Sequence, residues 1–378
     1  MHSTYLIATL CGVAIAQKLN IKAVDELELP SALGPDAANP TFVPAAYDSQ
    51  KAAEFAASSV LNDGLSLETV VEEVIFDRRD GLRKRNDCSP ETPGLGPVPG
   101  DGSVASYQDS ANSLHSVALA ALPPNGYEQN FINVDASTQQ VGYLTYKSLS
   151  NGSYNIPECA AFCDSVQLCM AFNVWYERDP SITPAAACPN PAPVTNAKCA
   201  LYGYPVSRES ATNVGQYRGP QDANGQAFQV VVIGSNGYSK SNSSNSSTPG
   251  AFTNFTGPSE LLNGAIFAPL VDGNDTYLGM RLYNNGPYDP SLCAATCQAT
   301  TAYDQRHPAA DGTYQPCNFF NAFILSKNDV SQGTYCAFYS RAWDPSYATN
   351  TGYKDGDDTY TVTSSYSYTL TTLDPGHI

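Results

Sequence analysis

Short runs of β-branched and aromatic residues recur after residue 140 and predict strands, because such side chains pack well on a pleated, half-buried surface. The first set covers residues 142–146, 171–176, 199–202 and 228–233, and the second covers residues 277–280, 319–325, 336–339 and 359–363. In each set a helix is predicted after a capping residue, Asn155 in the first and Asp289, before Pro290, in the second. The pattern predicts an α+β fold of two small units, each an antiparallel sheet with one packed helix.

The cysteines follow the same division, because one cysteine-centred pattern occurs twice. In both copies a Cys-x3-Cys pair is followed by Cys-x2-Phe-Asn, and then by a cysteine two residues before Leu-Tyr or Phe-Tyr. The cysteines involved are Cys159, Cys163, Cys169 and Cys199 in the first copy, and Cys293, Cys297, Cys317 and Cys336 in the second. Residues four apart share one helix face with nearly parallel side chains, so each helical cysteine is expected to bond to a different strand or loop.

This cysteine pattern resembles the PAN/apple module, in which a Cys-x3-Cys helix precedes a Cys-x2-Phe-Asn strand and a late strand with its own cysteine. Two such modules after a secretory signal and a dibasic site are similar to a group of secreted fungal proteins described as carbohydrate-binding-like. The resemblance covers residues 126–235 and 262–372, and it implies modules that bind proteins or carbohydrates and are not catalytic. The chain departs from the family in two long insertions, residues 177–198 and 299–316, which are expected to be loops.

The resemblance also implies how the cysteines pair. The first helical cysteine bonds to the late strand and the second to the Phe-Asn strand, which gives Cys159–Cys199, Cys163–Cys169, Cys293–Cys336 and Cys297–Cys317. Cys88 and Cys188 are then left, and export disfavours free thiols. A Cys88–Cys188 bridge is therefore predicted, which would order a proline-rich flap over the first unit.

The N-terminus has the features of a secretory signal. A short apolar stretch ends in a small-x-small pattern at Ala16, so residues 1–16 are expected to be a signal peptide, with a buried N-terminal helix as the alternative. Its removal takes Cys11 away and leaves ten cysteines, an even number that suits an oxidised extracellular protein.

The next segment is expected to be a pro-segment. Residues 17–85 contain no cysteine, are predicted to be partly helical over residues 49–76, and end in Lys84-Arg85, where a kexin-like protease would cut. The mature chain would then begin at Asn86, and a solvated basic turn is the alternative interpretation. The remaining segments are expected to be an extended N-terminal stretch at residues 86–125, a Ser/Asn-rich glycosylated linker at residues 236–261 and a tail at residues 373–378.

The charge argues against several classes of partner. The whole chain has a formal net charge of −17, and downstream of Arg85 there are 24 acidic and 11 basic residues. Such a surface repels phosphate backbones, so nucleic acid is a poor partner. No later apolar run predicts a membrane span or anchor, so a secreted monomer, extracellular or associated with the cell wall, is expected.

Five sequons predict glycosylation at Asn151, Asn242, Asn245, Asn254 and Asn274.

No catalytic residue, metal or cofactor is predicted. The histidines after the signal, His115, His307 and His377, do not have the spacing of a triad or a metal site. Carboxylates suggest two other interpretations, an acid pair of a glycosidase and a calcium site, but solvated turns explain them better on so acidic a surface. The candidates for the acid pair are Glu177, Asp179, Asp344, Asp355, Asp357 and Asp358, and those for calcium are Asp272, Asn274, Asp275 and residues 355–358.

The aromatic content favours recognition. The 24 tyrosines and two tryptophans exceed what two small cores are expected to enclose, so several rings are expected on the surface. Trp343, Asp344 and Tyr347 are the candidate ligand-binding residues, although Trp343 is equally consistent with packing, whereas Trp175 is predicted to lie in the core. The predicted function is non-catalytic binding of a polysaccharide or glycoprotein, with a protein-binding adhesin, a structural wall glycoprotein or an acid glycoside hydrolase as alternatives.

Overall fold

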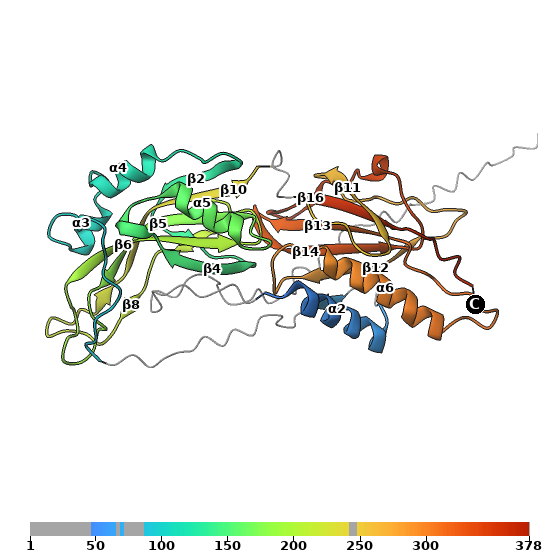
Figure 1. The fold of residues 1–378 in the computed structure, drawn as a ribbon, viewed down its shortest axis with the longest axis horizontal. Helices are drawn as coiled ribbons and strands as arrows, with labels where there is room; N and C mark the ends of the chain where they lie inside the picture. The colour runs from blue at the N-terminus through green and yellow to red at the C-terminus, as the bar shows by residue number, and fades with distance from the viewer. Residues whose placement is uncertain (1–46, 66–68, 72–86, 242–247, 378) are drawn as a thin grey trace, which may run out of the picture.

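The described residues form an α+β fold with two large, mostly antiparallel sheets, two small two-stranded sheets, few helices and five disulfides. The computed structural model describes residues 47–65, 69–71, 87–241 and 248–377 (Figure 1). The predicted signal peptide, the processing residues Ala16, Lys84 and Arg85, and the sequons at Asn242 and Asn245 lie outside the described residues.

The first sheet has the strand order β2-β10-β5-β6-β4, and each neighbouring pair is antiparallel. Its strands are β2 (Tyr127–Val134), β4 (Tyr143–Ser148), β5 (Ala171–Pro180), β6 (Pro193–Tyr202) and β10 (Val231–Lys240). Helix α5 (Ile156–Ser165) packs against β5 and β6 and is capped by Asn155, whose side chain accepts from the Glu158 N–H. Smaller pairs join β3 (Ser137–Thr138) to β7 (Ala211–Asn213) and β8 (Tyr217–Arg218) to β9 (Phe228–Gln229).

The second sheet repeats this order as β11-β16-β13-β14-β12. Its strands are β11 (Phe255–Leu262), β12 (Tyr277–Tyr283), β13 (Phe319–Lys327), β14 (Val330–Tyr339) and β16 (Asp358–Leu370), and helix α6 (Ser291–Arg306) packs against β13 and β14. Strand β15 (Gly352–Asp355) pairs with β16, and two 3-10 turns, η1 (Ser150–Gly152) and η2 (Pro345–Tyr347), complete the two halves. We call residues 127–240 the first repeat and residues 255–370 the second repeat.

Among the described residues, three helices and one strand lie outside the two repeats. Helices α3 (Val104–Gln108) and α4 (Ser113–Ala120) contact β10, so the stretch of residues 86–125 is not simply extended, as the sequence suggested. Helix α2 (Ser49–Asp63) lies beside α6, and strand β1 (Thr69–Val71) pairs in parallel with β12 (Figure 1). The described part of the predicted pro-segment, residues 47–65 and 69–71, therefore extends the second repeat.

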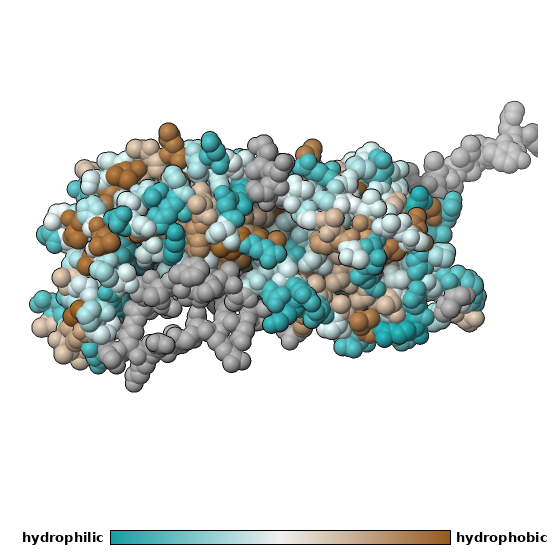
Figure 2. Space-filling view, viewed as in Figure 1, coloured by the Kyte–Doolittle hydropathy of each residue, from teal (hydrophilic) through white to brown (hydrophobic). Residues whose placement is uncertain are grey.

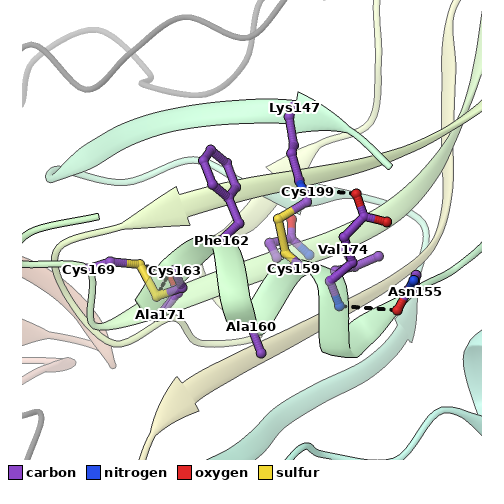
Figure 3. The surroundings of a disulfide bond; sticks show 12 residues. Lys147, Asn155, Cys159, Ala160, Phe162, Cys163, Cys169, Ala171, Val174 and Cys199 are labelled. Carbon is purple, nitrogen blue, oxygen red and sulfur yellow. Dashed lines mark hydrogen bonds and ion pairs between the residues drawn. A yellow bond between two sulfur atoms is a disulfide. The ribbon is translucent and has the colours of Figure 1, made fainter. Parts of the chain in front are cut away.

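The five disulfides join the same cysteine pairs that were expected. Cys159–Cys199 links α5 to β6, and Cys293–Cys336 links α6 to β14. Cys163–Cys169 and Cys297–Cys317 link each helix to the segment just before the next strand, β5 or β13. Figure 3 shows the two helical cysteines of α5 reaching different partners. Cys88–Cys188 joins the N-terminal segment to the hairpin between β5 and β6, with a Cα–Cα distance of 6.0 Å.

The two insertions differ from the expected loops. Strands β5 and β6 stay paired from Ala171 with Tyr202 out to Pro180 with Pro193, so much of residues 177–198 is a long hairpin, and α6 continues to Arg306 inside the second insertion. The hairpin was missed because its inward-facing positions are charged. Glu177, Asp179 and Lys198 are all buried there, and their mutual ion pairs compensate for the loss of water.

Two asparagines explain why Phe-Asn is repeated. The buried Asn173 side chain accepts from the Thr138 N–H at 2.9 Å and donates to a β10 carbonyl at 2.8 Å. Asn321 makes the matching bonds, accepting from the Ile266 N–H at 2.9 Å and donating to a β16 carbonyl at 3.0 Å. In both repeats the asparagine side chain forms hydrogen bonds with backbone groups beside a register shift in the sheet. A hydrophobic residue at this position would leave those backbone groups without a partner.

The repeated aromatic residues are structural in the same way. The Tyr154 hydroxyl donates to the Val174 carbonyl at 2.8 Å, and the Tyr288 hydroxyl donates to the Ala322 carbonyl at 3.1 Å. Stacked pairs also recur, Phe172 with Tyr238 and Phe320 with Tyr368. These contacts place most of the repeated sequence in the core, and the prediction that Trp175 is a core residue is confirmed by its complete burial.

Candidate ligand-binding site

The candidate site lies in the second repeat, where the chain leaves β14. Trp343 is only 8% exposed, and its indole Nε1 donates to the Thr276 hydroxyl at 3.2 Å. Its ring belongs to the hydrophobic core on one face of the second sheet. Trp343 is therefore mainly a packing residue.

Tyr347 is the exposed ring of this loop. Its side chain is 38% exposed and packs edge-on against Trp343, with ring centroids 4.8 Å apart and planes 66° from parallel. The Arg341 guanidinium lies 5.0 Å from the Trp343 ring centroid, which adds a cation–π contact to the cluster. These contacts pack the Tyr347 ring against the Trp343 ring.

Asp344 has a structural role in the site. Its carboxylate accepts from the Ser346 N–H at 2.9 Å and so caps the short turn η2 that carries Tyr347. Hydrogen bonding from Ser346 lowers the pKa of Asp344, which keeps the cap ionised. The structure thus brings the three predicted residues together, with Asp344 positioning the loop.

A hollow of about 400 Å³ opens beside this loop, between β11 and the ends of β13 and β16. Two rings and two prolines supply its apolar walls, and four hydroxyl-bearing side chains supply its polar groups. The lining residues are Thr256, Gly257, Pro258, Ser259, Phe319, Trp343, Pro345, Ser367 and Thr369. None of them is charged, in contrast to the acidic chain as a whole.

An irregularity in β11 shapes one wall of the hollow. The pairing of β11 with β16 shifts between Thr256 and Ser259, across the cis peptide bond of Gly257-Pro258. Gly257 has φ +144°, and a β-carbon there would lie 2.7 Å from the Tyr368 ring, so only glycine fits. Sequence reasoning missed this wall, although Gly-Pro inside a strand pattern indicates a bulge.

Another pair of candidate carboxylates is enclosed in the first repeat. Lys198 Nζ lies 2.5 Å from Glu177 Oε1 and 3.1 Å from Asp179 Oδ2, and all three residues are at most 5% exposed. Buried and held in this way, Glu177 and Asp179 do not present an acid pair to a polysaccharide, which was one interpretation of the sequence.

The other candidates lie in exposed hairpins and turns. Asp355, Asp357 and Asp358 are at the β15–β16 turn, where Lys327 pairs with Asp358 at 2.9 Å and lowers its pKa. The side chain of Asp275 accepts from the Tyr277 N–H at 2.9 Å, as in a solvated turn. Across the part of the chain that the structure describes, no three His, Cys, Asp or Glu side chains gather in a way that could hold a metal ion.

The three histidines stay apart. His115 is buried on α4 with its Nδ1 2.8 Å from Asn133 Oδ1, His307 follows α6, and His377 lies near the C-terminus beside Thr313. The fold does not assemble them into one site.

Exposed aromatic rings are fewer than the sequence suggested. Among the described residues, only Tyr217, Tyr347 and Tyr353 are exposed aromatic side chains. Most of the other rings lie in or against hydrophobic clusters on both faces of each sheet. Figure 2 shows hydrophobic residues in small scattered groups on the face in view.

The described sequons are open to modification. Asn151, Asn254 and Asn274 are all exposed, as glycosylation requires. Asn254 begins the sequon that ends at Thr256, a residue of the hollow.

Comparison with known proteins gave no further assignment. The chain matches no protein-family model, no curated protein and no solved structure. Within the described ranges, no helix has the length and apolar character to cross a membrane.

Proposed function

We propose that this chain is a secreted, non-catalytic glycoprotein that binds carbohydrate, and that the hollow beside Trp343 and Tyr347 is its ligand site. The observation that supports the proposal most is the uncharged lining of that hollow within an acidic chain. Sugar rings pack their C–H faces on aromatic rings and exchange hydrogen bonds with hydroxyl groups. Both kinds of group are present in the lining.

The resemblance to PAN/apple modules is part of the same proposal. Each repeat has the same strand order and one helix tied by disulfides to the sheet, which supports two modules of one kind. Modules of that family bind carbohydrates or proteins. The polysaccharide of a cell wall or host is the ligand we favour, since the lining has no charge with which to select an ionic partner.

Polysaccharide binding by a matched pair of tyrosine variants tests the site. Tyr347→Ala is expected to weaken retention on the preferred polysaccharide about tenfold, because the ring next to the hollow is lost. Tyr353→Ala is the control, since Tyr353 is 40% exposed, close to the 38% of Tyr347, but lies on β15, whereas the Tyr347 ring packs against Trp343, a lining residue of the hollow. Trp343→Ala is a poor test because removing a core ring also costs about 3 kcal/mol or more of stability.

The preferred polysaccharide is first identified by binding of the secreted protein to a glycan and polysaccharide array. Binding that is equal in both tyrosine variants would move the site away from the hollow. No binding on the array, with capture of a protein ligand, would favour the adhesin, and release only by harsh wall extraction would favour a structural wall glycoprotein. Cleavage of a bound glycan would contradict the non-catalytic proposal and favour a glycoside hydrolase.

A further inference from the structure

Helix α2 lies against the second repeat through one small, fully buried face. Ala52, Ala56 and Val60 are each 0% exposed, and their spacing of four places them along a single stripe. Ala52 and Ala56 belong to the same hydrophobic core as Leu292 and Ala294 of α6. Small side chains on both helices allow the close approach seen in Figure 1. A removable pro-segment does not need to share a core with the rest of the protein.

Polar bonds fix the start of α2. The Tyr47 hydroxyl donates to Asp289 Oδ2 at 2.7 Å, and the Ser49 hydroxyl donates to the same oxygen at 2.5 Å. Asp289 is only 3% exposed, and its other oxygen accepts from the Ser291 N–H at the start of α6. Removal of α2 would therefore take two donors from a buried carboxylate, which is an expensive group to leave unsatisfied.

The end of α2 is held as well. Arg306 Nη2 donates to the Leu61 carbonyl at 2.8 Å, and Arg281 Nη2 donates to the Gly64 carbonyl at 3.4 Å. Both arginines come from the second repeat, and both satisfy carbonyls at the C-terminal end of the helix, where cations are favourable. Strand β1 then continues the attachment through backbone pairing with β12.

We propose that residues 47–65 and 69–71 are a permanent part of the second repeat, and that proteolysis between Val71 and Asn86 yields two chains that stay together. Residues 17–85 contain no cysteine, so a disulfide cannot join the two pieces, and the contacts above would hold them. The surface of α6 and β12 in the second repeat is thus covered by a segment of the same chain. This inference is independent of the proposed carbohydrate site, because α2 contributes nothing to the lining of the hollow.

The test uses the full chain with a site-specific protease sequence inserted between Val71 and Asn86. After complete cutting, verified on a denaturing gel, native mass spectrometry and gel filtration report whether the pieces remain together. We expect a one-to-one complex in which the N-terminal piece elutes with residues 86–378. Separate elution of the two pieces, in a chain whose only change is the inserted protease sequence, would overturn the proposal.

Two arginine substitutions on α2 provide the matched control. Ala56→Arg places a charge in the buried stripe and is expected to lower the retained fraction about tenfold or more, whereas Ser58→Arg, at an exposed position of the same helix, is expected to retain the piece. Equal retention in both variants would contradict the proposed interface. If Ala56→Arg is not secreted, Ser49→Ala replaces it, and a reduced retained fraction is again expected.

Discussion

Two carboxylates share one ammonium inside the first repeat, and this has consequences for single residues. Burial and the charge of Glu177 raise the pKa of Asp179 to about 7. Burial also works to raise the pKa of Glu177, but the charge of Lys198 and hydrogen bonds outweigh it and leave that pKa lowered. Asp179 therefore carries the proton that makes the trio electrically neutral in acid.

We expect the stability of the protein to fall as the pH rises towards about 7. Because the pKa of Asp179 is raised from its ordinary value of 3.8, its contribution to stability is complete below that value and is lost progressively as the pH rises from there through about 7. Asp179→Asn should flatten the dependence of Tm on pH between 5 and 8. The free energy of unfolding of the wild type should differ by about 1–3 kcal/mol between the two ends of this range, and the variant should lose that difference. Asp344→Asn, at an exposed cap, is the control and should not flatten it. An unchanged pH profile in Asp179→Asn would show that another group is responsible.

At the same scale, the sequence showed part of the candidate site. Trp343, Asp344 and Tyr347 are close along the chain, so a loop with two rings was visible directly. Phe319 and Thr369 were not, because they are distant in sequence and meet the loop only through the pairing of β13 with β16. Strand register, which no local pattern specifies, creates the hollow.

At the scale of elements, runs of β-branched and aromatic residues predicted strands in both sheets, and both disulfide-bearing helices were predicted, but β2 and β11 were not. Asp289 was expected to cap α6, whereas the cap position is Pro290, which makes no side-chain cap bond. The predicted runs 171–176 and 319–325 lie within β5 and β13, and Asn155 caps α5 as expected. The segment of residues 87–100 was harder to predict, since hydrogen bonds and an ion pair hold it in place and it has no apolar stripe. Cys88 N–H donates to the Thr183 carbonyl at 3.1 Å, and Glu91 pairs with Arg218.

Removal of the Cys88–Cys188 bridge should loosen that segment selectively. In the double variant Cys88→Ser, Cys188→Ser, the first repeat is expected to lose about 2–4 kcal/mol, since a loop of 100 residues is no longer closed. Hydrogen exchange should quicken over residues 87–100 and 181–192 and stay constant in the second repeat. Uniform quickening across both repeats would show that the bridge stabilises the whole protein and not one flap.

At the scale of the whole molecule, the two repeats share a packed junction. Tyr204, fully buried, lies in the core of the second repeat, and its hydroxyl is 3.0 Å from that of Thr334. The Tyr288 N–H donates to the Gly203 carbonyl at 3.0 Å, and a β-carbon on Gly203 would lie 2.1 Å from Cβ of Pro287. The repeats were expected to be separate units on a linker of residues 236–261. Instead, β10 runs to Lys240, β11 starts at Phe255, and side chains cross the junction.

This junction should make the two repeats unfold together. Tyr204→Ala is expected to cost about 3–4 kcal/mol and to split a single calorimetric transition into two. Tyr217→Ala, which removes a ring that is 70% exposed, should leave one transition at nearly the same midpoint. Two transitions already present in the wild type would mean that the junction does not couple the repeats.

The parallel pairing of β1 with β12 has a further consequence for how copies of this protein meet. A terminal strand of a sheet displays unpaired N–H and C=O groups, which invite a strand from a neighbouring molecule. In the second repeat Thr69–Val71 pairs along Arg281–Tyr283 and is itself the terminal strand on this side of the sheet. Because a strand of three residues offers few free backbone groups, only a short border is left open here, and a protein that lost its N-terminal piece would expose the longer strand β12 as a template for self-association.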